Sequence, residues 1–225
     1  MPIYKKVNKN FFKKWDYNMS YILGFFAADG YITINKRGGQ FWCIQIIDRT
    51  FLEEIKNTIE SNHKINIRID KLTKNKIYRL QIGSIEMCDD LKKLGFEKNK
   101  TKRMLVPNIP KKYFSEFVRG YFDGDGNIWS GYIHKNGKNK KKTLQIMFTS
   151  CSLDFLKQLH VKLKEVGIQG GSIYNHKDKY ARLSFSLMDS LKICNFMYNG
   201  RVDIQSNLFL QRKKKIFEEF KHLRA

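Results

Sequence analysis

The segment YILGFFAADGYI at residues 21–32 is written a second time, as FVRGYFDGDGNI, at residues 117–128. Each copy reads as an apolar helix with an internal glycine, ends in Asp-Gly and runs into a strand pattern. A single copy would be an ordinary helix end, because glycine readily adopts a positive φ there. Two copies in the same local context indicate a repeated structural unit, so the residues after each copy should also correspond.

The residues that follow the two segments also correspond. The first continues with GYITIN, FWCIQII and RTFLEEIKNTI, and the second with GNIWSGYI, TLQIMFT and SLDFLKQLHVKLKEVG. A hairpin pattern and a further helix complete each half. The predicted fold class is α+β, with two pseudo-symmetric αββαββα repeats, each a four-stranded antiparallel sheet covered by helices, and the two motif helices packed at the interface. Pro107 and Pro110 interrupt regular structure, which places the boundary between repeats 1–106 and 107–225.

The composition restricts the possible partners and cofactors. Lys and Arg number 43 against 21 Asp and Glu, and this net charge of +22 favours polyanions as partners. The sequence shows no apolar run long enough for a membrane span and no signal peptide, so we expect an intracellular protein in a bacterial or phage cytoplasm or an organelle. The histidine and cysteine spacings do not fit zinc sites, and the four cysteines are expected to be buried, reduced thiols. Nucleotide-binding glycine motifs are also missing, which argues against ATP and NAD.

The segments ILGFFAADG at residues 22–30 and VRGYFDGDG at residues 118–126 resemble the motif that names the LAGLIDADG homing endonucleases, in their single-chain, two-repeat form. The resemblance implies a monomeric, site-specific endonuclease that cuts both strands of double-stranded DNA at a long, partly asymmetric site, with no membrane partner. It also implies an intron- or intein-associated mobility enzyme. One departure is Ala27, where the family usually has an acid, while Asp123 keeps that acid in the second copy.

The small residues of the two motif helices explain how their acids could meet. Gly24 and Gly120 allow a close helix approach, which would bring Asp29 and Asp125 together at the helix C-termini. Two carboxylates there repel each other and the helix macrodipoles, unless a divalent cation lies between them. Oxygen ligands suit Mg²⁺, for which Mn²⁺ is expected to substitute, whereas Ca²⁺ is expected to bind without supporting efficient cleavage.

The resemblance adds further members to the predicted active site. It implies that the main-chain carbonyls of Ala28 and Gly124 complete the metal ligands. It also implies a basic residue near the end of each repeat that organises water or phosphate. The candidates are Lys100 in the first repeat and Arg212 or Lys213 in the second.

Strand alternation predicts which side chains face DNA, since a β-ribbon fits the major groove and Asn, Gln and Arg can contact base edges there. The turn lysines are expected to contact phosphates without reading sequence. The open-face candidates of the first repeat are Thr33, Asn35, Arg37, Gln45, Arg68, Asp70, Arg79 and Gln81; those of the second are Trp129, Ile133, Gln145, Tyr174 and Arg182, and the turn candidates are Lys138, Lys140, Lys141 and Lys142.

Two non-cleaving functions remain compatible with this sequence. The same scaffold could bind RNA as an intron maturase, or act as a DNA-binding regulator that has lost cleavage. The acids at Asp29 and Asp125 favour cleavage over both alternatives. A module that only binds gains nothing from paired carboxylates beside phosphates.

Overall fold

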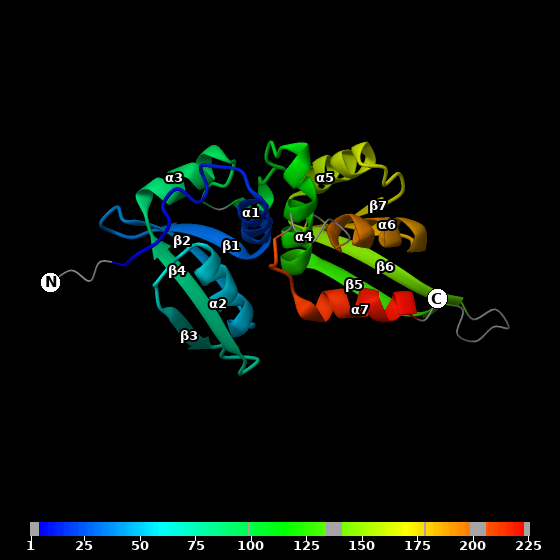
Figure 1. The fold of residues 1–225 in the computed structure, drawn as a ribbon, viewed down its shortest axis with the longest axis horizontal. Helices are drawn as coiled ribbons and strands as arrows, with labels where there is room; N and C mark the ends of the chain where they lie inside the picture. Colours follow the sequence, from blue (N-terminus) through cyan, green and yellow to red (C-terminus); the bar gives the residue numbers. More distant parts are fainter. Residues whose placement is uncertain (1–4, 99, 134–140, 178, 199–205, 223–225) are drawn as a thin grey trace.

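The computed structural model describes residues 5–98, 100–133, 141–177, 179–198 and 206–222. Two halves lie side by side, and the helices α1 and α4 run along the join between them (Figure 1). The first half contains α1 (Tyr17–Asp29), β1 (Gly30–Ile34), β2 (Gln40–Ile46), α2 (Arg49–Thr58), β3 (Ile65–Ile69), β4 (Lys76–Gly83) and α3 (Ile85–Lys93). The second contains α4 (Phe114–Asp125), β5 (Gly126–Ile133), β6 (Lys141–Ser150), α5 (Leu153–Glu165), β7 (Ser172–His176), β8 (Tyr180–Phe185) and α6 (Leu187–Tyr198).

The two sheets have the same topology. Their strand orders are β1-β2-β4-β3 and β5-β6-β8-β7, and every paired strand is antiparallel. This confirms the predicted α+β class and the αββαββα order of each repeat. The sequence patterns did not predict the short 3₁₀ helices Lys100–Lys102 and Lys111–Tyr113, nor the C-terminal helix α7 (Gln211–His222), which packs along β5. The predicted repeat boundary at residue 106 lies between the two 3₁₀ helices and stays a prediction.

Local signals explain where several helices begin. The side chain of the residue before the helix accepts a hydrogen bond from a backbone N–H of the first turn and so satisfies a donor that has no partner within the helix. The acceptors are Asp16 for α1, Asp48 for α2, Ser84 for α3 and Ser152 for α5.

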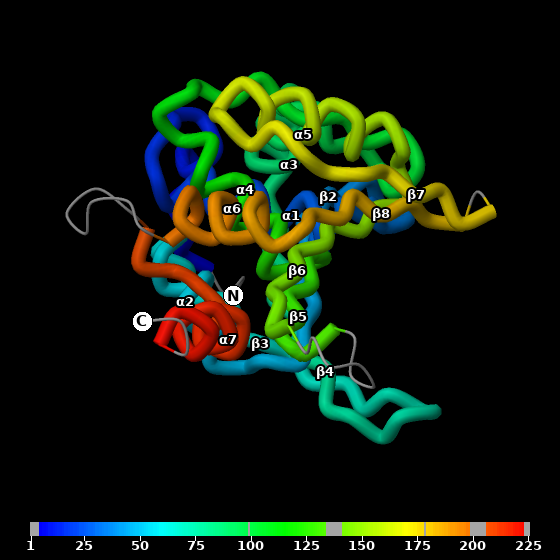
Figure 2. Tube along the Cα trace, turned by 90° about the vertical axis from the view of Figure 1, so that its right-hand side faces the viewer, coloured from blue at the N-terminus to red at the C-terminus, as the bar shows by residue number. Residues whose placement is uncertain are grey.

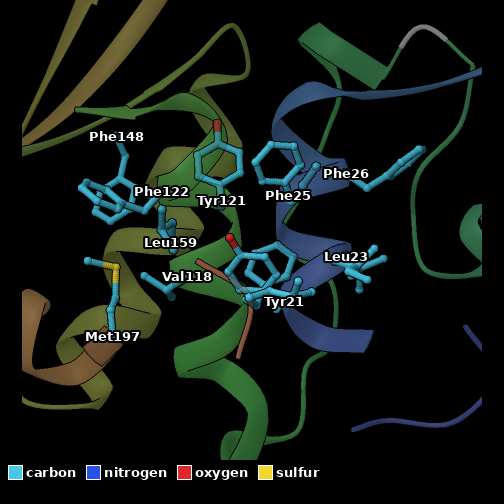
Figure 3. Close-up of a cluster of buried hydrophobic side chains, with 14 of the residues drawn as sticks. Tyr21, Leu23, Phe25, Phe26, Val118, Tyr121, Phe122, Phe148, Leu159 and Met197 are labelled. Carbon is cyan, nitrogen blue, oxygen red and sulfur yellow. The ribbon is translucent and has the colours of Figure 1, made fainter. Parts of the chain in front are cut away.

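The helices α1 and α4 pack so closely that their backbones touch. A Cβ atom at Gly24 would collide with the carbonyl oxygen of Phe117, and one at Gly120 would collide with that of Tyr21. Aromatic side chains of both helices surround this contact (Figure 3). α1 is covered by its own sheet and by α4 of the second half, so its residues from Met19 to Ala27 are buried on almost every side. The glycines therefore set the distance between the repeats, as their spacing predicted.

Two further observations concern the chain as a whole. Cys43, Cys88 and Cys194 are buried free thiols, but Cys151 is exposed at the end of β6, so the expectation for that cysteine was wrong. Cys151 comes directly after the last residue of β6, so the alternation of buried and exposed strand positions does not reach it. Among the described helices, none is both long and apolar enough to cross a membrane.

Candidate active site and nucleic-acid interface

Each motif helix ends in an aspartate that leads directly into the edge strand of its own sheet. Asp29 is the last residue of α1 and Asp125 the last of α4. The following glycines, Gly30 and Gly126, have φ of −91° and −83°, so the turn is extended and needs no positive φ. Glycine is required there because a Cβ atom would collide with the ring of Phe26 or Phe122 in the preceding turn. The glycines thus serve the tight helix-to-strand corner that brings the acids to the sheet edge.

The two helix ends meet, which places both acids in one centre. A Cβ atom at Gly124 would collide with that of Ala28 and would lie 3.1 Å from Oδ2 of Asp29. Desolvation raises the pKa of Asp29 to about 6, and the neighbouring charge of Asp125 acts in the same direction. Partial loss of water also raises the pKa of Asp125, the more exposed of the two acids. The pair therefore resists holding two negative charges, which is the condition that a bound cation relieves.

Two buried lysines accompany these acids, one from each repeat. Nζ of Lys100 donates to the carbonyl oxygen of Ala27 at 2.5 Å, and Nζ of Lys213 donates to that of Asp123 at 2.8 Å. Ala27 and Asp123 occupy the same place in the two motif copies, so the lysines are related by the internal symmetry. Burial lowers the pKa of each lysine to about 8, while the aspartate charges act in the opposite direction.

The structure separates the two candidates that the sequence left open in the second repeat. Lys213 is 5% exposed and also donates to the carbonyl oxygens of Phe122 and Gly126, at 2.5 and 2.6 Å. Arg212 is exposed and lines the two cavities that flank the helix ends. By position, Lys213 is the counterpart of Lys100. The catalytic assignment of all three residues stays a prediction.

Cavities lie on both sides of the paired helix ends. One of about 620 Å³ opens toward the first repeat and is lined by Asp29, Gln45 and Asp48, among others. A second of about 310 Å³ opens toward β5 and is lined by Gly124, Asn127 and other residues. Both contain Arg212, so a positive charge stands beside each opening. A polyanion lying across the helix ends would meet both cavities.

The donor set around the acids fits a hard divalent cation. Within the described ranges, no group of three or more His, Cys, Asp or Glu residues is placed to hold a metal. The chain thus offers Asp29, Asp125 and main-chain carbonyls, and leaves the other positions to water or a phosphate. Mg²⁺ has this preference, since it takes oxygen ligands and commonly keeps waters or substrate phosphates. The carbonyl of Gly124 lies 3.5 Å from Nζ of Lys213, and the proposed part of Ala28 and Gly124 in metal binding stays a prediction.

The open face of the first sheet carries polar side chains in register. Gln45, Arg79 and Asn66 lie opposite one another on three neighbouring strands, next to the buried Ile44, Leu80 and Ile65. The same alternation places further residues on this face. Thr33, Arg68 and Gln81 lie on this face, as predicted. Tyr31 and Asn66 also lie there and were not predicted, although the alternation of the strands could have identified both.

Three residues predicted on this face lie in turns instead. Asn35 and Arg37 follow the end of β1, and Oδ1 of Asn35 accepts the backbone N–H groups of Arg37 and Gly39 at 2.9 and 2.8 Å. Asp70 follows the end of β3, where its carboxylate accepts the N–H of Thr73 at 2.7 Å. The prediction of strand positions was wrong there, because short polar side chains capture nearby backbone donors and end the strand. The second of these turns lies at the tip of the hairpin that projects from the body of the protein (Figure 2).

The open face of the second sheet is more aromatic. Trp129 lies opposite Gln145, and Tyr174 lies opposite Arg182. The two aromatic side chains are 40% and 57% exposed, and the indole of Trp129 lies across Gly131. The strand pattern did not predict the ring pair of His176 and Tyr180, whose centroids are 4.6 Å apart on the same face. The strand pattern correctly placed Ile133 on the open face, where it pairs with Lys141 at the end of β5.

The predicted turn lysines of the second repeat are only partly described. Lys141 and Lys142 begin β6 and are strand residues, so their assignment to a turn was wrong. Strand pairing with β5 starts earlier than the lysine-rich composition suggested. Lys138 and Lys140 lie outside the described residues.

The comparisons with known proteins agree with this architecture. A family profile described as a LAGLIDADG-like domain matches residues 16–95 and 113–212. An uncharacterized protein of Methanocaldococcus jannaschii is 25% identical over 77% of this chain, and a probable translation initiation factor of Thermococcus kodakarensis is 31% identical over 57% of it. The chain spans 63% of the first relative's length and 11% of the second's.

Solved structures of meganucleases share the fold. I-SmaMI bound to uncleavable DNA is 14% identical, with a TM-score of 0.62, and the match covers 91% of this chain and 89% of that one. The homing endonuclease I-GzeII in complex with its DNA target is 15% identical, with a TM-score of 0.58 and coverage of 91% and 88%. I-SmaMI bound to uncleaved DNA with calcium ions is 14% identical, with a TM-score of 0.58 and coverage of 91% and 92%.

Proposed function

The chain belongs to the LAGLIDADG-like domain family, and we propose that it is a site-specific endonuclease that cuts both strands of duplex DNA with the help of Mg²⁺. The observation that carries this proposal is the paired centre at the join of the repeats. Asp29 and Asp125 meet at the ends of two touching helices, and Lys100 and Lys213 are buried beside them at symmetric places. One acid and one lysine per repeat is the arrangement needed to serve the two antiparallel strands of a duplex.

The residues of the chain divide the chemistry between them. Asp29 and Asp125, with main-chain carbonyls such as those of Ala28 and Gly124, would hold the cation. When bound, a divalent cation supplies Lewis-acid stabilisation to the scissile phosphate and its leaving oxygen. Lys100 and Lys213, with pKa values of about 8, exchange protons near neutral pH and are suited to hold a charge or move a proton beside that phosphate.

The two open sheet faces would bind the DNA on either side of this centre. Strands fit the major groove, and the amide and guanidinium groups of the first sheet can contact base edges there. Because the first face differs from the second, we propose that the target is long and only partly symmetric, and that one chain acts as a monomer. The DNA complexes of I-SmaMI and I-GzeII support this placement by fold alone.

The direct test is a cleavage screen. The purified chain is incubated with a randomised or genomic DNA library and Mg²⁺, and double-strand ends are sequenced. We expect ends clustered at one long motif, and the same library treated with the Asp29→Asn, Asp125→Asn double variant is the control. Ends that match in the two samples, or the lack of an enriched motif with Mg²⁺ and Mn²⁺, would contradict the proposal.

RNA maturation is the second candidate, and one observation favours it. Exposed aromatic side chains such as Trp129 and Tyr174 are suited to stack on the unpaired bases of structured RNA. Competition between duplex DNA and structured RNA at matched salt decides between the two. A clear preference for RNA, together with an inactive cleavage screen, would favour the maturase.

A further inference from the structure

One face of α4 carries three buried charged residues, whereas the matching face of α1 carries none. Glu116, Arg119 and Asp123 are all at most 2% exposed. They follow one another along the helix at spacings of three and four residues, so they lie on one side of it. The corresponding positions of the first motif copy are Ser20, Leu23 and Ala27.

Arg119 bonds to the end of α6 and to Ser206, which comes before α7. Its guanidinium donates to the carbonyl oxygen of Ser206 at 2.6 Å and to that of Met197 at 3.0 Å, and it pairs with the carboxylate of Glu116. These bonds tie two described points to α4, namely Met197 near the end of α6 and Ser206 ahead of α7. The segment around Ser206 is therefore tied to α4 before α7 begins.

Asp123 binds the next part of the same segment. Its Oδ2 accepts the backbone N–H of Leu210 at 3.0 Å and the hydroxyl of Tyr21, from the opposite motif helix, at 2.6 Å. The carbonyl oxygen of Leu210 then accepts the N–H of Lys213 at 3.0 Å, in the first turn of α7. A continuous chain of hydrogen bonds thus runs from α1 through Asp123 to the buried lysine of the second repeat.

The first repeat holds its lysine differently. The residues that correspond to Tyr21 and Asp123 are Phe117 and Ala27, which have neither a hydroxyl nor a carboxylate. Lys100 sits on a short 3₁₀ helix, and its own Nζ contact to the carbonyl of Ala27 resembles that of Lys213. The two lysines therefore reach equivalent acceptors. Among the described residues, only Lys213 is supported by a side-chain clamp, formed by the Asp123 carboxylate with Tyr21 and Leu210.

We propose that Asp123, oriented by Tyr21, is a positioning residue for Lys213 through Leu210, and that it acts on the cleavage of only one DNA strand. This inference rests on the proposed endonuclease function. Because the clamp has no equivalent at Lys100, weakening it displaces one lysine and leaves the other in place. The structural alternative is that Tyr21 and Asp123 merely join the two motif helices, in which case their loss affects both strands alike.

The test compares the nicking rates of the two strands. A duplex with the selected target is labelled on each strand, and single-turnover rates are measured for Lys100→Met and Lys213→Met to find which strand depends on which lysine. The double variant Tyr21→Phe, Asp123→Ala, called the Asp123 variant below, has the same side chains as the corresponding residues Phe117 and Ala27. We expect it to slow only the strand that depends on Lys213, by roughly 10- to 100-fold.

Ser20→Ala is the matched control. The Ser20 hydroxyl is buried in the same helix pair and donates to the carbonyl of Tyr113 at 2.8 Å, away from Lys213. We expect this variant to leave the ratio of the two nicking rates unchanged. Equal slowing of both strands by the Asp123 variant, or lysine variants without any strand preference, would overturn the inference.

A second measurement does not depend on cleavage. Amide hydrogen exchange reports whether the start of α7 is held by Asp123. In the Asp123 variant we expect the amides of Leu210 and Lys213 to exchange at least roughly tenfold faster, while Arg103 and Met104, whose amides bond to Lys100, keep their rates. Unchanged exchange at α7 would also overturn the inference. Wild-type protein that fails to cut DNA would overturn the endonuclease proposal and the strand assignment with it, while the exchange rates would still test whether Asp123 positions Lys213.

Discussion

The first sheet presents amide and guanidinium groups on its open face, whereas the second presents aromatic rings beside a few polar groups. Gln45, Arg79 and Asn66 lie in register on the first. On the second, Trp129 and Tyr174 occupy comparable exposed places. Both sheets have the same topology and join equivalent helices, so the fold does not require this difference.

The difference shows which parts of a repeated protein can diverge. The two halves must match where the motif helices touch at Gly24 and Gly120 and where Asp29 and Asp125 share one centre. Open-face side chains lie outside the contact between α1 and α4, so that contact does not restrict them. We therefore expect similar effects from matched changes at the two glycines or at the two acids, and unequal effects from changes on the sheets.

The largest effect is expected at the acids. Asp29→Asn and Asp125→Asn should each lower double-strand cleavage by at least about 1000-fold, because each removes a cation ligand and several kcal/mol of stabilisation of the reacting phosphate. DNA affinity, measured by fluorescence anisotropy, should change little, since the surface is almost the same. Full cleavage by either variant would show that the centre is not shared by the two repeats.

The helix contact should be nearly as sensitive in both repeats. Gly24→Ala and Gly120→Ala each force a methyl group against a backbone carbonyl, and we expect each to lower the free energy of unfolding by about 3 kcal/mol. Urea denaturation measures this. Asn57→Ala, on the exposed side of α2, is the control and should change stability by less than about 0.5 kcal/mol. A small effect at either glycine would mean that the helices can separate at no cost.

The pH dependence of stability should show the raised pKa of Asp29. The pKa of Asp29 is about 6 in the folded protein against 3.8 for the free group, so the folded state binds the proton more tightly. The free energy of unfolding of the metal-free protein should therefore fall as the pH rises between these values. Asp29→Asn should remove part of that fall, and saturating Mg²⁺ should reverse it, because the cation stabilises the ionised acid. A stability that rises over this range without metal would contradict the assignment.

Base recognition should distinguish the two faces. Arg79→Ala should relax discrimination at a few base pairs under the first sheet, by about 1–3 kcal/mol for each bidentate pair of hydrogen bonds that the arginine makes to a base. Trp129→Ala should instead reduce the sensitivity of the second half-site to replacement of thymine by uracil, which removes only the methyl group. Binding to a panel of single-base variants measures both. If the two variants gave the same profile of changes, the faces would not differ in function.

The smallest effect is expected from single phosphate contacts. Lys141→Gln, at the exposed start of β6, should weaken binding to all sequences alike and flatten the dependence of log K on log salt by about 0.9. Lys157→Gln, on the helix-covered side in α5, is the control and should leave the slope unchanged. A change in base preference in the Lys141 variant would mean that this lysine reads sequence rather than phosphate.

Much of the fold followed from short-range patterns. Alternation correctly placed Gln45, Arg79, Trp129 and Arg182 on open faces, because residues on a strand point to opposite sides in turn. The same rule failed at Asn35 and Asp70, where a side chain captures nearby backbone donors and the strand stops. Where a strand ends depends on whether side chains or the neighbouring strand bind the backbone N–H groups, and the alternation of residues does not predict this.

The sequence by itself determined the repeat, the touching glycine helices and the meeting of the two acids, since each of these follows from spacing within one segment or from its second copy. Only the tertiary structure showed that Lys213, unlike Arg212, is buried against the end of α4, and that Asp123 bonds to the backbone of Leu210. Those contacts join residues almost ninety positions apart, and their energy depends on burial that no local pattern encodes. Arg212 and Lys213 are adjacent in the sequence, but Arg212 is exposed and Lys213 is buried because α7 directs only Lys213 toward the end of α4.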